Sequence, residues 1–144
     1  MLAEPRSTMT TTTMTPPLDV LVVDDDDGAR EVMAMAITSL GHRCRVASSG
    51  EAALSEIAAA RPDVVISDLE MPGMSGTELC RRLRASSDGI SRVYFIVLSG
   101  YGDQAHRDAG AAVGVDSYQL KPVDLVELEA SLHSAASIWW RATC

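Results

Sequence analysis

The chain has 144 residues, of which 47% are hydrophobic and 22% charged, a balance typical of one globular domain with a buried core. Twenty acidic against 12 basic residues give a net charge of -8, which argues against direct binding to nucleic acid because a phosphate backbone requires a basic surface. No apolar run has the length of a membrane span, and the N-terminus lacks the apolar segment of a secretory signal.

Residues 1–17 are rich in Thr and Met, end in Pro16-Pro17 and lack apolar periodicity. We expect them to form a flexible tail, and residues 18–144 to form the folded domain. The three cysteines show no metal-binding or disulfide spacing. Cys44 and Cys80 are therefore expected to be small buried side chains, and the protein to be cytoplasmic.

Taken in chain order, short apolar runs alternate with helical patterns. The expected strands are Val20–Val23, Cys44–Ala47, Val64–Ile66, Val93–Leu98 and Ser117–Leu120. The expected helices are Ala29–Leu40, Glu51–Ala60, Thr77–Arg84, Asp103–Val113 and Leu125–Trp140. Five β-α repeats predict an α/β fold, with a parallel sheet and helices on both faces.

Reactive side chains follow several of these strands. Four acids, residues 24–27, come after the first strand, and Asp68 ends the third. Ser99 follows the fourth strand and Lys121 the fifth. Because sites in such sheets form beyond the carboxyl ends of the strands, we expect these groups to meet at one edge.

The expected cluster has a definite chemistry. Two carboxylates about 4 Å apart repel by roughly 4 kcal/mol at an effective dielectric constant near 20, so clustered acids require a cation or protons. Oxygen ligands with open positions suit Mg²⁺. Together with the Lys121 ammonium and the Ser99 hydroxyl they would receive a phosphoryl group, and a central carboxylate can become an aspartyl phosphate.

Four motifs carry a family resemblance: VLVVDDDDGARE, ISDLEMPGMSG, LSGYGD and DSYQLKP. In this order and at this spacing the chain resembles the receiver domain of two-component response regulators, of the single-domain type, from Leu18 to Ile138. The resemblance implies a flavodoxin-like, doubly wound (βα)5 fold with strand order 2-1-3-4-5. It also implies a signalling domain rather than an enzyme, one that catalyses only its own phosphorylation and dephosphorylation.

The resemblance assigns roles to matching residues. Asp68 is implied to accept a phosphoryl group from the phosphohistidine of a histidine kinase or a phosphotransfer protein. Asp25 is implied to bind Mg²⁺ (or Mn²⁺) directly, together with Asp68, and Asp24 to bind it directly or through water. The backbone carbonyl of Glu70 is implied as a further ligand.

Three other positions follow from the same resemblance. Ser99 would hydrogen-bond the phosphoryl group, Lys121 would pair with it, and the Lys121-Pro122 bond would be cis. Tyr118 would be the rotating aromatic residue of the switch, with a core aromatic as the alternative. Asp26 and Asp27 are more simply explained as a solvated start of the first helix.

The expected output is a surface made by Asp103–Val113, Ser117–Leu120 and Leu125–Trp140, which a downstream protein would recognise. Because the sequence ends at Cys144, we expect output through another protein or through phosphoryl relay. The pair Trp139-Trp140 is a candidate anchor for a partner or a homodimer, or is covered by the chain end.

Two departures from the commonest family pattern lie beside the site. Glu70 and Tyr101 flank the path by which water would attack the phosphoryl group, and we hypothesise that they set its lifetime, with the sign left open. Gly110 lies inside an expected helix poor in large apolar residues, which predicts a weakly held segment. His42, His106 and His133 share no spacing and are not expected to be ligands.

Two other classes of protein are alternatives. A hydrolase of the haloacid-dehalogenase type would use Asp24 as nucleophile and Asp26 as acid, although Gly28 departs from its pattern. A flavodoxin-type flavin module requires a hydroxyl- and Gly-rich phosphate loop after the first strand. Here four acids occupy that loop and would repel a phosphate.

Overall fold

The computed structural model describes residues 16–86 and 92–143, with the backbone alone for residues 139–143. Most of the expected tail and the side chains of Trp139 and Trp140 therefore lie outside the described residues. In the described part of the chain, no helix has the length and apolar composition of a membrane span.

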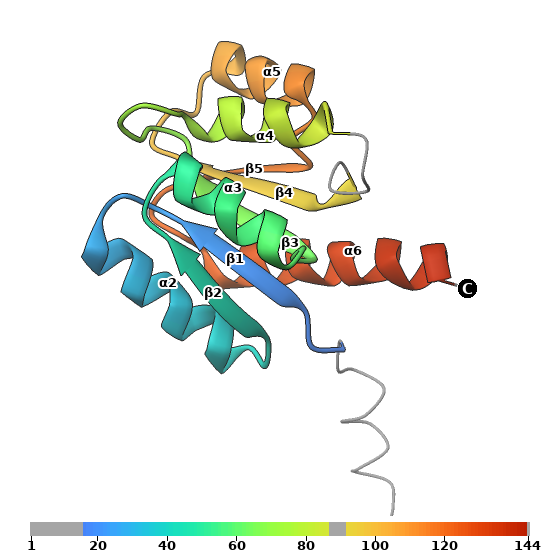
Figure 1. Cartoon of the computed structure of the whole chain (residues 1–144). Helices are drawn as coiled ribbons and strands as arrows, with labels where there is room; N and C mark the ends of the chain where they lie inside the picture. The colour runs from blue at the N-terminus through green and yellow to red at the C-terminus, as the bar shows by residue number, and fades with distance from the viewer. Residues whose placement is uncertain (1–15, 87–91, 144) are drawn as a thin grey trace, which may run out of the picture.

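Five parallel strands form a single sheet in the order β2-β1-β3-β4-β5 (Figure 1). Their bounds are Asp19–Val23 (β1), Arg43–Ala47 (β2), Val64–Asp68 (β3), Tyr94–Ser99 (β4) and Ser117–Leu120 (β5). The predicted α/β fold, its strand order and all five predicted strands are thus confirmed, with bounds that differ by no more than two residues at either end.

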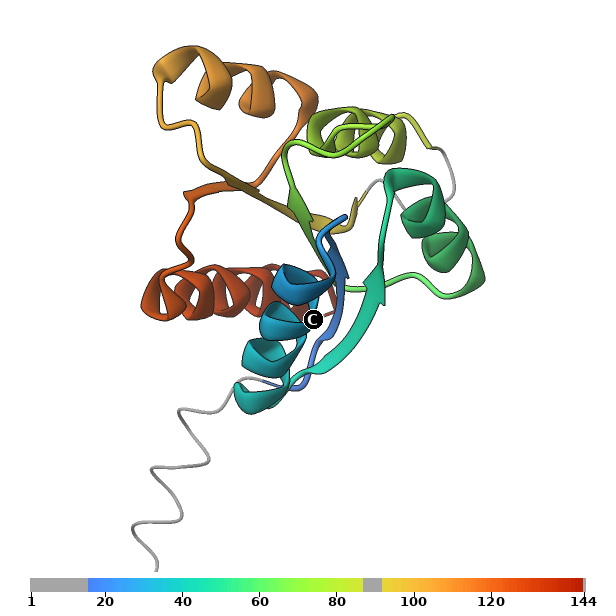
Figure 2. The same cartoon turned by 90° about the vertical axis from the view of Figure 1, so that its left-hand side faces the viewer.

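Five helices connect and follow the strands: Asp27–Ser39 (α2), Gly50–Ala59 (α3), Gly76–Arg84 (α4), Gln104–Val113 (α5) and Leu125–Thr143 (α6). Helices α2 and α6 cover one face of the sheet, while α3, α4 and α5 lie on the other (Figures 1 and 2). The central strands β1, β3 and β4 therefore run between two layers of helices, which explains why they are nearly continuous apolar runs, whereas the edge strand β2 is largely exposed or half-buried.

Alternate residues of the central strands point into two separate cores. Leu21, Val65 and Phe95 pack under α3 and α4. Ile66 and Ile96 pack under α2 and α6. Because β1, β3 and β4 are parallel neighbours in the sheet, their carboxyl ends lie at the same edge.

Helices α2, α5 and α6 differ in which of their residues are buried. On α2, Met33 and Ile37, which lie four residues apart on one face, are buried. On α6, Leu128 and Leu132 are buried, but Leu125, three residues before Leu128, is 51% exposed. On α5, Gly110 is the only described residue that is buried, as expected of a weakly held helix.

Candidate functional site

The acids after β1 and β3 meet at the carboxyl edge of the sheet. Asp24 is 7% exposed and follows the last residue of β1, and Asp68 is the last residue of β3. One carboxylate oxygen from each of Asp24, Asp25 and Asp68 lies within 4.8 Å of the others. The structure therefore brings together the three side chains predicted from the sequence to hold a metal.

The acidic loop is fixed by its own backbone and by Arg30. The carboxylate of Asp24 accepts a hydrogen bond from the backbone N–H of Asp26 at 2.9 Å. The Arg30 guanidinium donates to the backbone carbonyl of Asp24 at 2.8 Å and pairs with the Asp27 carboxylate. Asp26 caps α2 by accepting from the backbone N–H of Ala29, so the interpretation of Asp26 and Asp27 as the start of a helix is confirmed.

Lys121 reaches the same point from the end of β5. Its Nζ lies 2.8 Å from Oδ1 of Asp68, and the Lys121-Pro122 bond is cis, as expected. Partial burial acts to lower the pKa of Lys121, but its hydrogen bond to Asp68 and the charges of Asp24 and Asp25 outweigh burial and raise it. The ammonium therefore stays charged beside the Asp68 carboxylate.

Ser99 lines the cavity around Asp68, whereas Tyr118 does not. Ser99 is buried at the end of β4, and it lines a cavity of about 330 Å³ together with Asp68 and Lys121. The Tyr118 hydroxyl instead donates to the backbone carbonyl of Tyr101 at 2.7 Å. Tyr118 is half-buried and packs against the edge of the core under α3 and α4, so it combines a polar contact with the apolar packing of the alternative interpretation.

The electrostatics of the cluster favour a cation. Burial raises the pKa of Asp24, against the effect of the hydrogen bond from Asp26, and the charge of Asp68 raises it further. Three carboxylates face one ammonium, so a net negative charge remains at the edge of the sheet. Several oxygen ligands with excess negative charge fit a hard divalent cation such as Mg²⁺.

Sequence reasoning missed three residues at this site. Gly76 packs against β3, and a Cβ built on it would lie 2.4 Å from the backbone carbonyl oxygen of Asp68. Arg30 could have been found from its spacing to Asp27, because side chains three residues apart on a helix are neighbours. His106 is not expected from the sequence to have a role at the site, yet its ring stacks on Tyr101 with a centroid distance of 4.5 Å, and no sequence spacing signals that contact.

The geometry weakens the hydrolase alternative. That function requires Asp26 to act as an acid beside Asp24, but the Asp26 carboxylate is directed to the backbone N–H of Ala29 and is exposed. The residue that shares the cavity with Ser99 and Lys121 is Asp68, on a different strand.

Comparison with known sequences agrees with this arrangement. The family described as "Response regulator receiver domain" matches residues 20–133. The response regulator MprA of Mycolicibacterium vanbaalenii is 37% identical over 118 residues, which cover 82% of this chain and 50% of that protein. The transcriptional regulatory protein AfsQ1 of Streptomyces coelicolor is 33% identical over 115 residues, covering 80% and 49%. The chain thus spans about half the length of these curated relatives.

Solved structures show the same likeness. A putative response regulator from Chloroflexus aurantiacus superposes with a TM-score of 0.79 at 32% identity, covering 85% of this chain and 99% of that one. The chemotaxis protein CheY4 of Vibrio cholerae gives 0.77 at 28% identity, covering 83% and 99%. With its sheet order, its acidic edge and these relatives, the chain belongs to the receiver-domain family of response regulators, the signalling domains of two-component systems.

Proposed function

We propose that this receiver domain accepts a phosphoryl group from a phosphohistidine onto Asp68 in a Mg²⁺-dependent reaction. The observation that carries the proposal is the convergence on Asp68: oxygens of Asp24 and Asp25 within 4.8 Å, and the Lys121 ammonium at 2.8 Å. A carboxylate between a cation site and an ammonium can act as a nucleophile toward phosphorus, since the charges that develop on the phosphoryl oxygens are balanced on both sides.

In the proposed reaction a carboxylate oxygen of Asp68 attacks the phosphorus atom, and the bond from phosphorus to the donor's imidazole nitrogen breaks. The imidazole leaves with the electron pair of that bond. Lys121 would pair with one phosphoryl oxygen and the Ser99 hydroxyl would donate to another, because both side chains line the cavity that contains Asp68. Asp24, Asp25, Asp68 and the backbone carbonyl of Glu70 would hold Mg²⁺ or Mn²⁺, which supplies positive charge to the transferring group.

We infer that the donor protein docks in an apolar groove of about 530 Å³ between α2 and the segment after β5. Ala29, Val32 and Leu125 line the groove, and Asp24 and Lys121 lie at its polar end. Val32 is 67% exposed and Leu125 51% exposed. A helix laid on such a groove would present its histidine to Asp68, which is the helix-in-groove mode of recognition.

A charged side chain in the groove should slow phosphoryl transfer from a protein donor but not from a small-molecule donor. Val32→Glu is expected to slow transfer from a histidine kinase that phosphorylates the parent, while uptake from acetyl phosphate stays unchanged. Met35→Glu is the matched control, since Met35 is 68% exposed on the same helix but does not line the groove. Equal transfer rates for Val32→Glu and Met35→Glu would exclude this docking surface.

For output we propose the surface of α5, β5 and α6, where a downstream protein would bind, or a second copy of the chain. Leu120 is 39% exposed and Val126 77% exposed on this surface, and Tyr118 connects it to the loop after Ser99. Hydrogen exchange should change in α5 and β5 on phosphorylation, and unchanged exchange there would reject this surface.

The role of the domain would be regulatory rather than enzymatic. The unpaired thiols of Cys44 and Cys80 support a cytoplasmic location.

The proposed function is tested by intact mass after incubation with acetyl phosphate, with and without Mg²⁺. The parent should gain one phosphoryl group only with the metal, and Asp68→Asn should gain none. Asp26→Asn is the control, because an Asn retains the helix cap and should be phosphorylated like the parent. A parent that gains no mass, or an Asp68→Asn variant that still does, would refute the assignment.

A further inference from the structure

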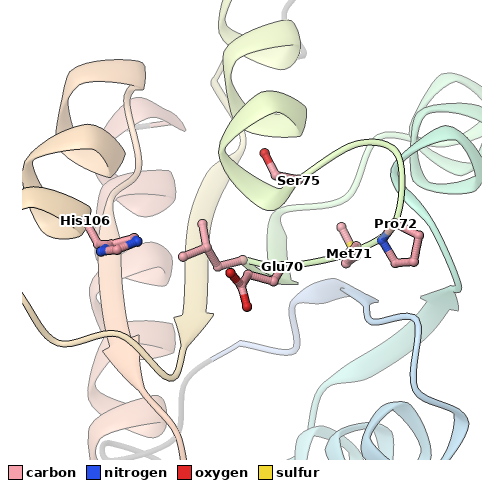
Figure 3. Close-up of a pocket in the computed structure, with 6 residues that line it drawn as sticks. Glu70, Met71, Pro72, Ser75 and His106 are labelled. Carbon is pink, nitrogen blue, oxygen red and sulfur yellow. The ribbon is translucent and has the colours of Figure 1, made fainter.

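Tyr101 lies between the Asp68 cavity and a second hollow on the outside of the domain. It lines the inner cavity with Asp68 and Lys121. The outer hollow, of about 510 Å³, is lined by Glu70, Met71, Pro72, Ser75 and His106 (Figure 3). Leu69 and Glu70 line both spaces, so the outer hollow adjoins the Asp68 cavity at these two residues.

Contacts from several elements hold Tyr101 in this position. Its backbone N–H donates to the Ser99 hydroxyl at 2.9 Å, and its carbonyl accepts from the Tyr118 hydroxyl. Its own hydroxyl is hydrogen-bonded to the Glu70 side chain, which raises the pKa of Tyr101. These contacts fix the backbone and the hydroxyl group of Tyr101. The residue as a whole is 42% exposed, so its ring requires a packing partner to stay in place.

His106, in the first turn of α5, supplies that surface. The two rings stack with a centroid distance of 4.5 Å and an interplanar angle of 7°. The imidazole is itself oriented, because Nδ1 lies 2.7 and 2.9 Å from the two carboxylate oxygens of Asp103. Asp103 also caps α5 by accepting from the backbone N–H of His106, so the stack moves with the start of the helix.

We propose that His106 is a positioning residue that holds the Tyr101 ring across the water path to the phosphorylated Asp68, so that the place of α5 sets the lifetime of the phosphoryl group. The inference rests on the proposed function. In the hydrolysis that it slows, a water oxygen attacks phosphorus, the bond from phosphorus to Oδ of Asp68 breaks, and inorganic phosphate leaves the restored carboxylate. A partner that moves α5 away from Tyr101 would therefore shorten the lifetime of the phosphoryl group.

The test is the half-life of the phosphorylated protein, followed by intact mass after acetyl phosphate is removed. His106→Ala removes the stacking ring and should shorten the half-life about two- to tenfold, as expected for the loss of one aromatic pair. His106→Phe retains a ring and should restore a half-life near that of the parent. Gln104→Ala, in the same turn but bonded to Asp108 instead, is the control and should resemble the parent.

A double-mutant cycle separates positioning from a general loosening of α5. In a Tyr101→Ala background, His106→Ala should have no further effect on the half-life. An equal effect with and without Tyr101, or no effect of His106→Ala in the parent, would overturn the inference while leaving Asp68 phosphorylation intact. A parent without phosphoryl uptake would refute the proposed function, and this inference with it.

A readout independent of phosphorylation guards against a variant that simply unfolds α5. Nuclear Overhauser contacts between the rings of Tyr101 and residue 106 should be present in the parent and in His106→Phe. If His106→Ala loses helix by circular dichroism, His106→Leu fills the same space without a ring and should give the same short half-life. A parent-like half-life in His106→Leu would contradict the stacking role.

Discussion

Lys121 is the only lysine of the sequence, and its ammonium lies 2.8 Å from Asp68. It occupies a position where it would share the carboxylate with a bound cation. The strand before Lys121 and its neighbour Pro122 predict this position from the sequence. The negative charge that Lys121 partly neutralises is seen only in the structure, where Asp24, Asp25 and Asp68 come together.

Removal of this charge should affect metal and phosphoryl binding in opposite directions. In Lys121→Met, Mg²⁺ should bind roughly 30-fold more tightly, since a unit charge about 4 Å from a divalent cation in a solvated site contributes about 2 kcal/mol of repulsion. Phosphoryl uptake from acetyl phosphate should fall because a partner of the phosphoryl oxygens is lost. Isothermal titration calorimetry with Mg²⁺ measures the first effect, Lys121→Arg is the control, and unchanged or weaker Mg²⁺ binding would count against this view.

At the scale of elements, the segment between β3 and α4 returns tightly onto the phosphoacceptor strand. The backbone N–H of Gly76 donates to the carbonyl of Leu69 at 2.8 Å. Gly73, earlier in the same loop, has φ +80°, the left-handed region that favours glycine. The backbone of Asp68 is thus packed against this loop, while its pairing within β3 fixes it in the sheet.

A methyl group at Gly76 should disturb this arrangement. In Gly76→Ala the new Cβ would lie 2.4 Å from the carbonyl oxygen of Asp68 and 3.1 Å from Oγ of Ser67, so the backbone must shift. We expect a loss of roughly 1–3 kcal/mol in the free energy of unfolding, with slower phosphoryl uptake. In Gly100→Ala, where no atom lies within 4 Å of the added Cβ, urea denaturation should give a nearly unchanged free energy of unfolding; similar losses in both variants would contradict the steric argument.

Helix α5 contains a glycine for a different reason. A Cβ on Gly110 would lie 3.4 Å from Cδ2 of Tyr118, so the glycine leaves space beside the aromatic ring. That distance is an ordinary contact, and Ala is favoured over Gly in a helix by about 1 kcal/mol.

Gly110→Ala should therefore raise the free energy of unfolding by up to about 1 kcal/mol and restrict the Tyr118 ring. Chemical denaturation measures the first effect and NMR relaxation of the ring protons the second. Ala112→Gly, at an exposed position of the same helix, should lower the free energy of unfolding by a similar amount. A lower free energy of unfolding in Gly110→Ala would contradict this prediction and show that the Tyr118 ring cannot move to accommodate the added methyl group.

For the whole molecule, a buried histidine makes stability depend on pH. His42 is 8% exposed, and its Nδ1 accepts a hydrogen bond from the backbone N–H of Leu18 at 3.0 Å. Burial lowers the pKa of His42 below its ordinary value of 6.5, against the charge of Glu129, which raises it. The unfolded chain therefore takes up a proton more readily than the folded one.

It follows that the stability contributed by neutral His42 is present above pH 6.5 and is lost as the pH falls below that value. The parent should lose more free energy of unfolding between pH 7.5 and pH 5.5 than His42→Gln, which has no proton to gain. Urea denaturation at both pH values measures the difference, in which the contributions of the carboxylates cancel. Parallel losses in the two proteins would contradict this account.

Patterns along the chain were sufficient to predict the α/β class, the five strands and the edge at which Asp24, Asp68, Ser99 and Lys121 meet. These features follow from local patterns, since buried parallel strands are continuous apolar runs and the carboxyl ends of parallel strands share one edge. Motif resemblance supplied the strand order, which short-range patterns do not contain, and the sheet confirms it.

The contacts between side chains of different elements became evident only from the three-dimensional fold. The stack of Tyr101 on His106, the approach of Gly76 to Asp68 and the exposure of Leu125 depend on how loops and helices pack. Such contacts join residues whose spacing along the chain has no fixed relation to distance in space. The side-chain period of a helix or strand therefore cannot predict them, and they are the contacts through which this domain would control its phosphoryl group.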